Sequence, residues 1–235
     1  MPKIPTPKRP RTAKRPVTKT AGREDGAQTR RQLIEVAGRL FAEHGYLRTT
    51  SKEICEVAGA NLAAVNYHFD GKDGLYAAVL EEAHARLVSI EFVTTATRGD
   101  ADIGTTLRTL LTRAVGQIMQ HDRDAWALRV LSREIMAPTP LADRMIANQV
   151  LPKFKLMAGP ISRALGVPAN HPAVNRCLVN IIGPCAFLLL TNPDWHKQVF
   201  PSLSLDAEAL VEHMVTFALG GLQAVAAELR RAKHK

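Results

Sequence analysis

The side chains best suited to chemistry lie in one short polar stretch, NLAAVNYHFDGKDGL, from position 61 to position 75. It includes Asn66, Tyr67, His68 and Lys72, all of which can form hydrogen bonds. An asparagine can pair with the N6 and N7 edge of adenine, and a lysine can neutralise a phosphate. The stretch therefore predicts contact with bases or phosphates of a nucleic acid.

The sequence lacks the patterns that would support an enzyme. It has no G-x-S-x-G, H-E-x-x-H, phosphate-loop or dinucleotide-binding fingerprint. Its histidines do not have the spacing of metal ligands, and its three cysteines form no C-x-x-C pair. We therefore expect no catalytic activity, no cofactor and no metal site.

Helices are predicted to position the polar stretch. From Thr29 onward, apolar residues follow the helical period as far as Gly45, which suits a left-handed C-cap. Thr50 and Glu53 have the spacing of a capping box, which predicts a second helix that ends at Gly59. This second helix would have only about two turns.

The polar stretch itself is predicted to form a third helix, followed by a fourth that starts between positions 70 and 73. Asn61 suits the N-cap, and Leu62, Val65 and Phe69 are expected to pack on the first two helices. Two short helices joined by a tight turn at Gly59 form a helix-turn-helix, whose second helix lies in the DNA major groove. The side chains then available to DNA include Asn61, Ala64, Asn66, Tyr67 and His68.

The residues around this motif resemble the DNA-binding domain of TetR/AcrR-family transcriptional regulators. The matching pieces, in order, are LFAEHGY, TT, EICEVAGA and YHF, followed by Lys72 and Leu75. The resemblance implies that Thr50 meets a phosphate through its hydroxyl and the neighbouring backbone N–H. It also implies that Lys72 binds a phosphate at the positive N-terminus of the fourth helix. Lys52, in the first turn of the second helix, is a further predicted DNA contact.

One position departs from the family pattern, because Asn66 stands where the family usually has tyrosine. Asn66 either reads adenine or faces solvent. Tyr67 either binds a phosphate or packs on the first helix. A structural role is more typical of His68, since Phe69 beside it belongs to the predicted core.

The net charge of +9 is concentrated in the N-terminal residues 1–23, which carry eight basic and no acidic side chains. Five prolines in the same segment oppose helix formation, so a disordered basic arm is predicted. Such an arm suits a polyanion such as DNA. A solubilising leader, or a start codon placed too far upstream, is the alternative interpretation.

The rest of the chain predicts an all-α fold, with a DNA-binding domain over residues 24–75 and a larger helical domain over residues 76–235. Five helices are expected after a break at positions 97–102, at 103–120, 124–136, 140–165, 172–190 and 206–231. Two stretches resemble the C-terminal domain of CecR-like regulators. They are LSREIMAPTPLADRMIANQVLPKF and HPAVNRCLVNIIGPCAFLLLTNP.

This resemblance implies a domain for ligand sensing and dimerisation, in which the last two long helices of each copy form a four-helix bundle. Gly220 and Gly221 predict either close packing against another helix or a local kink. Trp126 and Arg129, three residues apart, either line an effector cavity or are ordinary core and surface residues. The apolar run at positions 177–190 is too short to span a membrane and is predicted to be a buried helix.

These features together predict a cytoplasmic, homodimeric transcriptional regulator, most consistent with a repressor. Its expected partners are double-stranded DNA with a palindromic operator and a small-molecule effector that releases it, with no membrane association. A nonspecific architectural DNA-binding protein is the alternative, because the arm is so basic. The sequence does not name the effector or the operator.

Overall fold

The computed structural model describes residues 19–99, 102–119, 125–191, 198–202 and 206–233. These residues form helices and no strands, which confirms the predicted all-α fold class. The helices are α1 (Lys19–His44), α2 (Ser51–Ala58), α3 (Leu62–Phe69), α4 (Lys72–Leu87), α5 (Ile90–Ala96), α6 (Ile103–Met119), α7 (Ala125–Met136), α8 (Ala142–Met145), the π-helix η1 (Ile146–Val150), α9 (Leu151–Leu165), α10 (Pro172–Leu190) and α12 (Ala207–Lys233).

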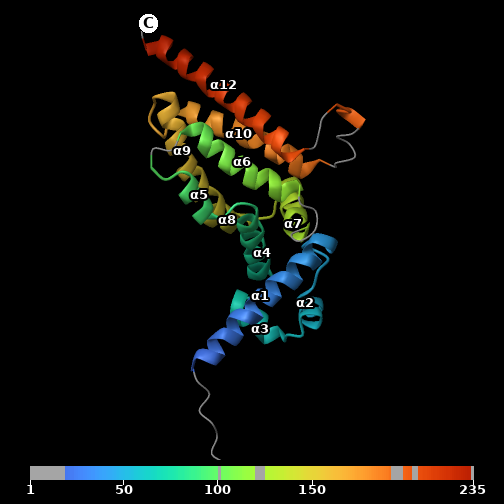
Figure 1. Ribbon diagram of the computed structural model, residues 1–235. Helices are drawn as coiled ribbons and strands as arrows, with labels where there is room; N and C mark the ends of the chain where they lie inside the picture. Colours follow the sequence, from blue (N-terminus) through green and yellow to red (C-terminus); the bar gives the residue numbers. More distant parts are fainter. Residues whose placement is uncertain (1–18, 100–101, 120–124, 192–197, 203–205, 234–235) are drawn as a thin grey trace, which may run out of the picture.

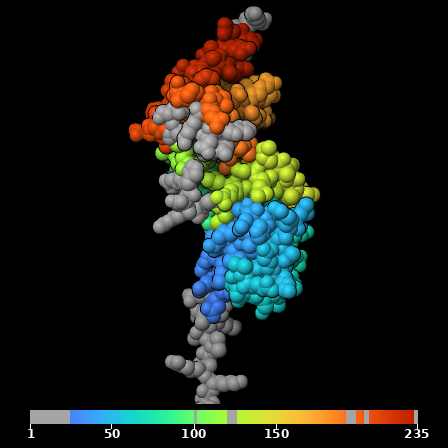
Figure 2. All heavy atoms as spheres, turned by 90° about the vertical axis from the view of Figure 1, so that its right-hand side faces the viewer, coloured from blue at the N-terminus to red at the C-terminus, as the bar shows by residue number. Residues whose placement is uncertain are grey.

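The molecule is elongated, with the helix-turn-helix at one end and the long helices of the C-terminal part at the other (Figure 1). Helices α1, α2 and α3 lie together at the lower end, and α10 and α12 lie at the upper end. Helix α4 leads from the lower group to the upper one. In Figure 2, the spheres of α7 and α8 lie directly against those of α1.

The predicted ends of the first helices are confirmed by their backbone geometry. Gly45 has a φ of 80° and Gly59 a φ of 62°, both in the left-handed region that suits a helix C-cap. The side chain of Thr50 accepts a hydrogen bond from the N–H of Glu53, and the Glu53 side chain reaches back to complete the capping box. Asn61 caps α3 by accepting from the N–H of Ala64 at 2.8 Å.

Three details differ from the expectation. Residues 19–23, assigned to the disordered arm, belong to α1, whereas residues 1–18 lie outside the described part of the chain. Helix α5 was missed, although Ser89 caps it. The helix expected at 140–165 is divided by η1 just before Pro152, because proline lacks an N–H donor and its ring would meet the carbonyl four residues earlier.

The hydrophobic core of the N-terminal part extends beyond α4 and includes residues of α7 and α8. The closest approach is between Gly38 of α1 and Trp126 of α7, since a β-carbon at Gly38 would lie 2.5 Å from the indole ring. The indole N–H of Trp126 donates to the carboxylate of Glu35 at 3.1 Å. Helix α7 is therefore packed on α1 as tightly as a helix with a side chain there would forbid.

A second core joins α5, α6, α9, α10 and α12. Beside it, at the contact of α4 with η1 and α9, Lys153 is buried with its ammonium 2.8 Å from Nδ1 of His84 and 3.1 Å from the Gln149 side-chain oxygen. Burial lowers the pKa of Lys153 to about 8, against the opposing charge of Glu91. Burial and the charge of Lys153 lower the pKa of His84 to about 4.

We expect Gly38→Ala to destabilise the protein by about 1 to 3 kcal/mol, because the added methyl group would collide with the Trp126 ring. Urea denaturation measures this free energy of unfolding. Gly116→Ala in α6 is the matched control, since a β-carbon there would meet no described atom within 4 Å. It should be neutral or slightly stabilising, because alanine favours the helix by up to about 1 kcal/mol. Equal effects of the two substitutions would contradict the close packing.

The lowered pKa of Lys153 predicts a pH dependence of stability. Since the usual value is 10.5 and the folded value is about 8, the unfolded chain binds more protons between these pH values. The free energy of unfolding should therefore gain a contribution as pH rises from 8 to 10.5. Lys153→Met should flatten this rise in urea denaturation, and the exposed Lys155→Met should leave it in place.

Candidate DNA-binding surface

The turn before α2 is fixed by a buried hydroxyl. The side chain of Thr49 is fully buried and donates to the carbonyls of Leu40 at 3.3 Å and Gly45 at 2.9 Å. At the other end of α2, the side-chain amide of Gln32 donates to the carbonyl of Ala58 at 2.9 Å. Helix α1 thus holds both ends of α2 through side-chain bonds.

Helix α3 packs through two of the three apolar residues that were expected to be inward. Val65 and Phe69 are buried, but Leu62 is 53% exposed, so that expectation was wrong for Leu62. The buried stripe of so short a helix runs through residues four apart, which places the first residue at its edge. Support for α3 therefore rests on Val65 and Phe69.

The outer face of α3 presents polar side chains to solvent. Asn66 is exposed and Tyr67 is 85% exposed, so the Tyr67 ring does not pack on α1. His68 is half-buried, with its ring 4.9 Å from that of Tyr67 and 6.0 Å from that of Phe69. Ala64 is half-buried. Asn66 and Tyr67 are thus the side chains of this helix that project furthest into solvent.

A tight turn brings Lys72 next to the end of α3. Asp70 and Gly71 both have positive φ values, 59° and 102°. A β-carbon at Gly74 would lie only 1.7 Å from the carbonyl oxygen of Phe69, so only glycine allows α4 to start so close to α3. The end of the recognition helix and the start of α4 therefore form one compact corner.

Lys72 begins α4 without a competing cap, because Gly71 before it offers no side-chain hydrogen bond to the helix. Unpaired N–H groups and the helix dipole make such an end favourable for an anion. The ammonium of Lys72 lies 4.3 Å from the centre of the Tyr46 ring. A cation and free N–H donors thus occur together at the start of α4.

Thr50 and Lys52 extend this polar surface onto α2. The Thr50 oxygen accepts from the N–H of Glu53 at 3.2 Å, which leaves its hydroxyl hydrogen available to a further acceptor. The Thr50 N–H is directed at the Glu53 carboxylate at 3.5 Å. The Lys52 side chain is 86% exposed, with only a long 3.8 Å contact to Glu56.

Comparison with known proteins gives two adjacent family matches. Residues 33–79 match the bacterial regulatory proteins of the tetR family. Residues 104–222, about half of the chain, match the C-terminal domain of the HTH-type transcriptional dual regulator CecR. The chain is a TetR-family transcriptional regulator with a CecR-type C-terminal domain. The predicted resemblance is therefore confirmed in both of its parts.

Individual relatives match this regulator over different lengths. The HTH-type transcriptional regulator TtgR of Pseudomonas putida is 40% identical over 62 residues, 26% of this chain and 30% of TtgR. CecR of Shigella flexneri is 27% identical over 184 residues, 71% of this chain and 81% of CecR. The crystal structure of FadR from Bacillus subtilis in complex with stearoyl-CoA superposes with a TM-score of 0.62 at 15% identity, covering 81% of this chain and 98% of FadR. That likeness shows the shared fold.

The structure places the two predicted ligand residues of the regulator apart from each other. Trp126 is 6% exposed and lies between Gly38, Glu35 and the guanidinium of Arg86, which is 4.8 Å from the indole ring. Arg129 is exposed on the surface of α7. Their role in ligand binding stays a prediction.

Sequence reasoning undervalued two neighbours of these residues, Arg133 and Glu134. Arg133 donates to the carbonyls of Ala42 at 3.0 Å and Glu43 at 3.2 Å, so it caps the C-terminal end of α1. Glu134 is buried and accepts from the hydroxyl of Tyr76 at 2.7 Å. A charged residue on the otherwise apolar face of α7 was the signal that could have found this contact.

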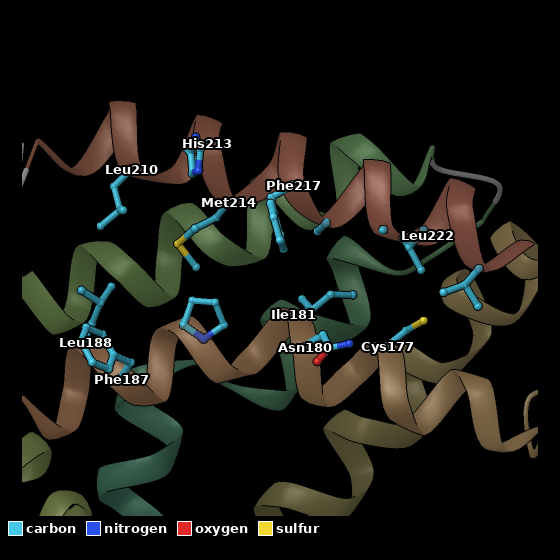
Figure 3. A pocket seen from close by; sticks show the side chains of 14 residues that line it. Cys177, Asn180, Ile181, Phe187, Leu188, Leu210, His213, Met214, Phe217 and Leu222 are labelled. Carbon is cyan, nitrogen blue, oxygen red and sulfur yellow. The ribbon is translucent and has the colours of Figure 1, made fainter. Parts of the chain in front are cut away.

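The far end of the regulator carries an open apolar groove of about 650 Å³ between α10 and α12 (Figure 3). Its walls include Ile181, Phe187, Met214 and Phe217. Helix α10 was predicted to be buried, but only one of its faces is, and by length and composition α10 and residues 207–232 would also suit a membrane span with 28% of each buried. This exposed face of α10 and α12 is hereafter called the apolar face.

Proposed function

We propose that this chain is a cytoplasmic, ligand-responsive repressor that binds a palindromic operator as a homodimer and is released by a small molecule. The observation that carries the proposal is the exposed outer face of α3, with Asn66 and Tyr67, next to Lys72 at the uncapped start of α4. A base-reading helix and a phosphate anchor on one rigid corner suit DNA recognition. The regulator performs no catalysis in this proposal.

Asn66 supports sequence-specific reading. Its side chain is exposed in the middle of the presumptive contact face of α3, where an amide can form a bidentate pair with adenine. Tyr67, exposed beside it, is available for a phosphate. Thr50 and Lys52 would add phosphate contacts from α2, which position the protein without reading sequence.

The apolar face supports the homodimer. Phe217 is 77% exposed, and Val179, Ile182 and Phe187 are also exposed on the same two helices. A methyl group added at Gly220 or Gly221 would meet no described atom within 4 Å, so packing within one copy does not require these glycines. A second copy that packs α10 and α12 into a four-helix bundle would bury this surface and bring helices close at the glycines.

An effector would act by changing the separation of the two recognition helices. Two-fold related α3 helices must meet half-sites about 34 to 36 Å apart. A ligand that favours another separation with a coupling of about 1 to 3 kcal/mol lowers operator affinity about 5- to 150-fold. The complex of FadR with stearoyl-CoA supports a small-molecule effector for a protein of this fold.

Two substitutions should separate base reading from phosphate binding. Asn66→Ala should weaken binding to the operator by about 1 to 3 kcal/mol and relax specificity at one base pair. Lys72→Ala should weaken binding to all sequences and reduce the salt dependence by about one phosphate contact. Fluorescence anisotropy on the DNA fragment found by genome-wide footprinting measures both.

Lys155→Ala is the control, because it removes an exposed lysine on α9, away from α3. If Asn66→Ala and Lys72→Ala both bind like the control, the assignment of this surface is refuted. A nonspecific architectural protein would instead show no preference for any discrete palindrome in competition with random DNA.

A charge on the apolar face should break the dimer. We expect Phe217→Glu to shift sedimentation velocity from dimer to monomer and to lower operator affinity, because a buried unpaired carboxylate is costly at an interface. Ile135→Glu is the matched control, since Ile135 is also an exposed apolar residue but lies on α7. Dissociation by both substitutions, or by neither, would count against this face.

A further inference from the structure

Lys72 is not a free surface side chain. Its ammonium lies 4.3 Å from the centre of the Tyr46 ring, within the range of a favourable cation–π contact. Tyr46 belongs to the turn between α1 and α2, whereas Lys72 is the first residue of α4. The contact therefore joins the segment that precedes α2 to the anchor that follows α3.

Tyr46 is itself held on two sides. Its hydroxyl donates to the carboxylate of Asp73 at 2.5 Å, and this bond, together with burial, raises the pKa of Tyr46 to about 12. Its ring lies 4.8 Å from the ring of Tyr76 and 6.2 Å from that of Phe41. The phenol thus stays a neutral donor at physiological pH, and the ring presents a fixed face to Lys72.

We propose that Tyr46 is a positioning residue that holds the Lys72 ammonium at the start of α4, ready for a DNA phosphate. This inference rests on the proposed DNA binding. A lysine has four rotatable side-chain bonds, and ordering them on binding costs conformational entropy. The Tyr46 face restricts the side chain before DNA arrives, so less is lost when the phosphate binds.

The same contacts connect Lys72 to the C-terminal domain. Tyr76, which packs against Tyr46, donates from its hydroxyl to the buried carboxylate of Glu134 on α7. Glu134 also accepts from the N–H of Thr139 at 2.6 Å and from its hydroxyl at 2.9 Å. The ring that holds the phosphate anchor is therefore braced by a side chain of the sensor half.

The test compares Tyr46→Leu, which removes the ring face, with Tyr46→Phe, which keeps it and loses only the hydroxyl. Operator affinity is measured by anisotropy from 50 to 300 mM salt on the fragment footprinted with the wild-type protein, in about half-log steps of protein concentration. Tyr46→Leu should lower affinity about 2- to 5-fold and reduce the slope of log K against log salt by about one unit. Tyr46→Phe should retain the wild-type slope.

A double variant completes the cycle. Because Tyr46 acts through Lys72, Tyr46→Leu should add little further loss to Lys72→Gln. Tyr76→Phe is the control, since it deletes a neighbouring hydroxyl but leaves both rings, and it should keep the slope. If Tyr46→Leu fails to fold by circular dichroism, Tyr46→Met replaces it, because methionine fills space without an aromatic face.

The outcomes distinguish this inference from the proposed function. An unchanged slope for folded Tyr46→Leu, or losses that add fully in the double variant, would overturn the positioning role while DNA binding stands. If the wild-type protein has no footprint, or Lys72→Gln alone does not change the slope, the phosphate anchor itself is wrong.

Discussion

The DNA-binding surface depends on the burial of two side chains from a helix that could not exist alone. Eight residues form too few hydrogen bonds to repay helix nucleation, so α3 persists only because Val65 and Phe69 pack into the N-terminal core. The absence of a side chain at Gly74 lets α4 start against the last carbonyl of α3. Recognition helix and phosphate anchor therefore share one support, and displacement of either disturbs both.

That support does not end at the boundary between the two family domains. Trp126 fills the space left by Gly38, Arg133 binds the last carbonyls of α1, and Glu134 holds Tyr76. Helix α7 is thus bonded to α1 and α4 by packing and by charge-assisted hydrogen bonds, which are stronger than neutral ones. A movement within the C-terminal domain that carries α7 along would move the DNA-binding helices as one body.

Local chemistry was predictable from the sequence, and contacts between distant segments were not. Thr50, Gly59 and Asn61 act on backbone groups within four residues, so their spacing alone predicted the ends of α2 and α3. The exposure of Leu62, the approach of Trp126 to Gly38, and the ring of Tyr46 beneath Lys72 each depend on how helices cross. Apolar α10 was read as buried for the same reason, since composition does not say which face a neighbour covers.

The position of the apolar face has a mechanical consequence for the proposed dimer. Helices α10 and α12 lie at the end of the elongated molecule opposite α3 (Figure 1). If two copies join at that end, each copy acts as a lever, and a small rotation at the interface displaces α3 through the full length of the chain. Since half-sites tolerate only a narrow separation, an effector needs to change the interface angle only slightly to release DNA. Close packing between α1 and α7 matters here, because a lever must be stiff to transmit the rotation.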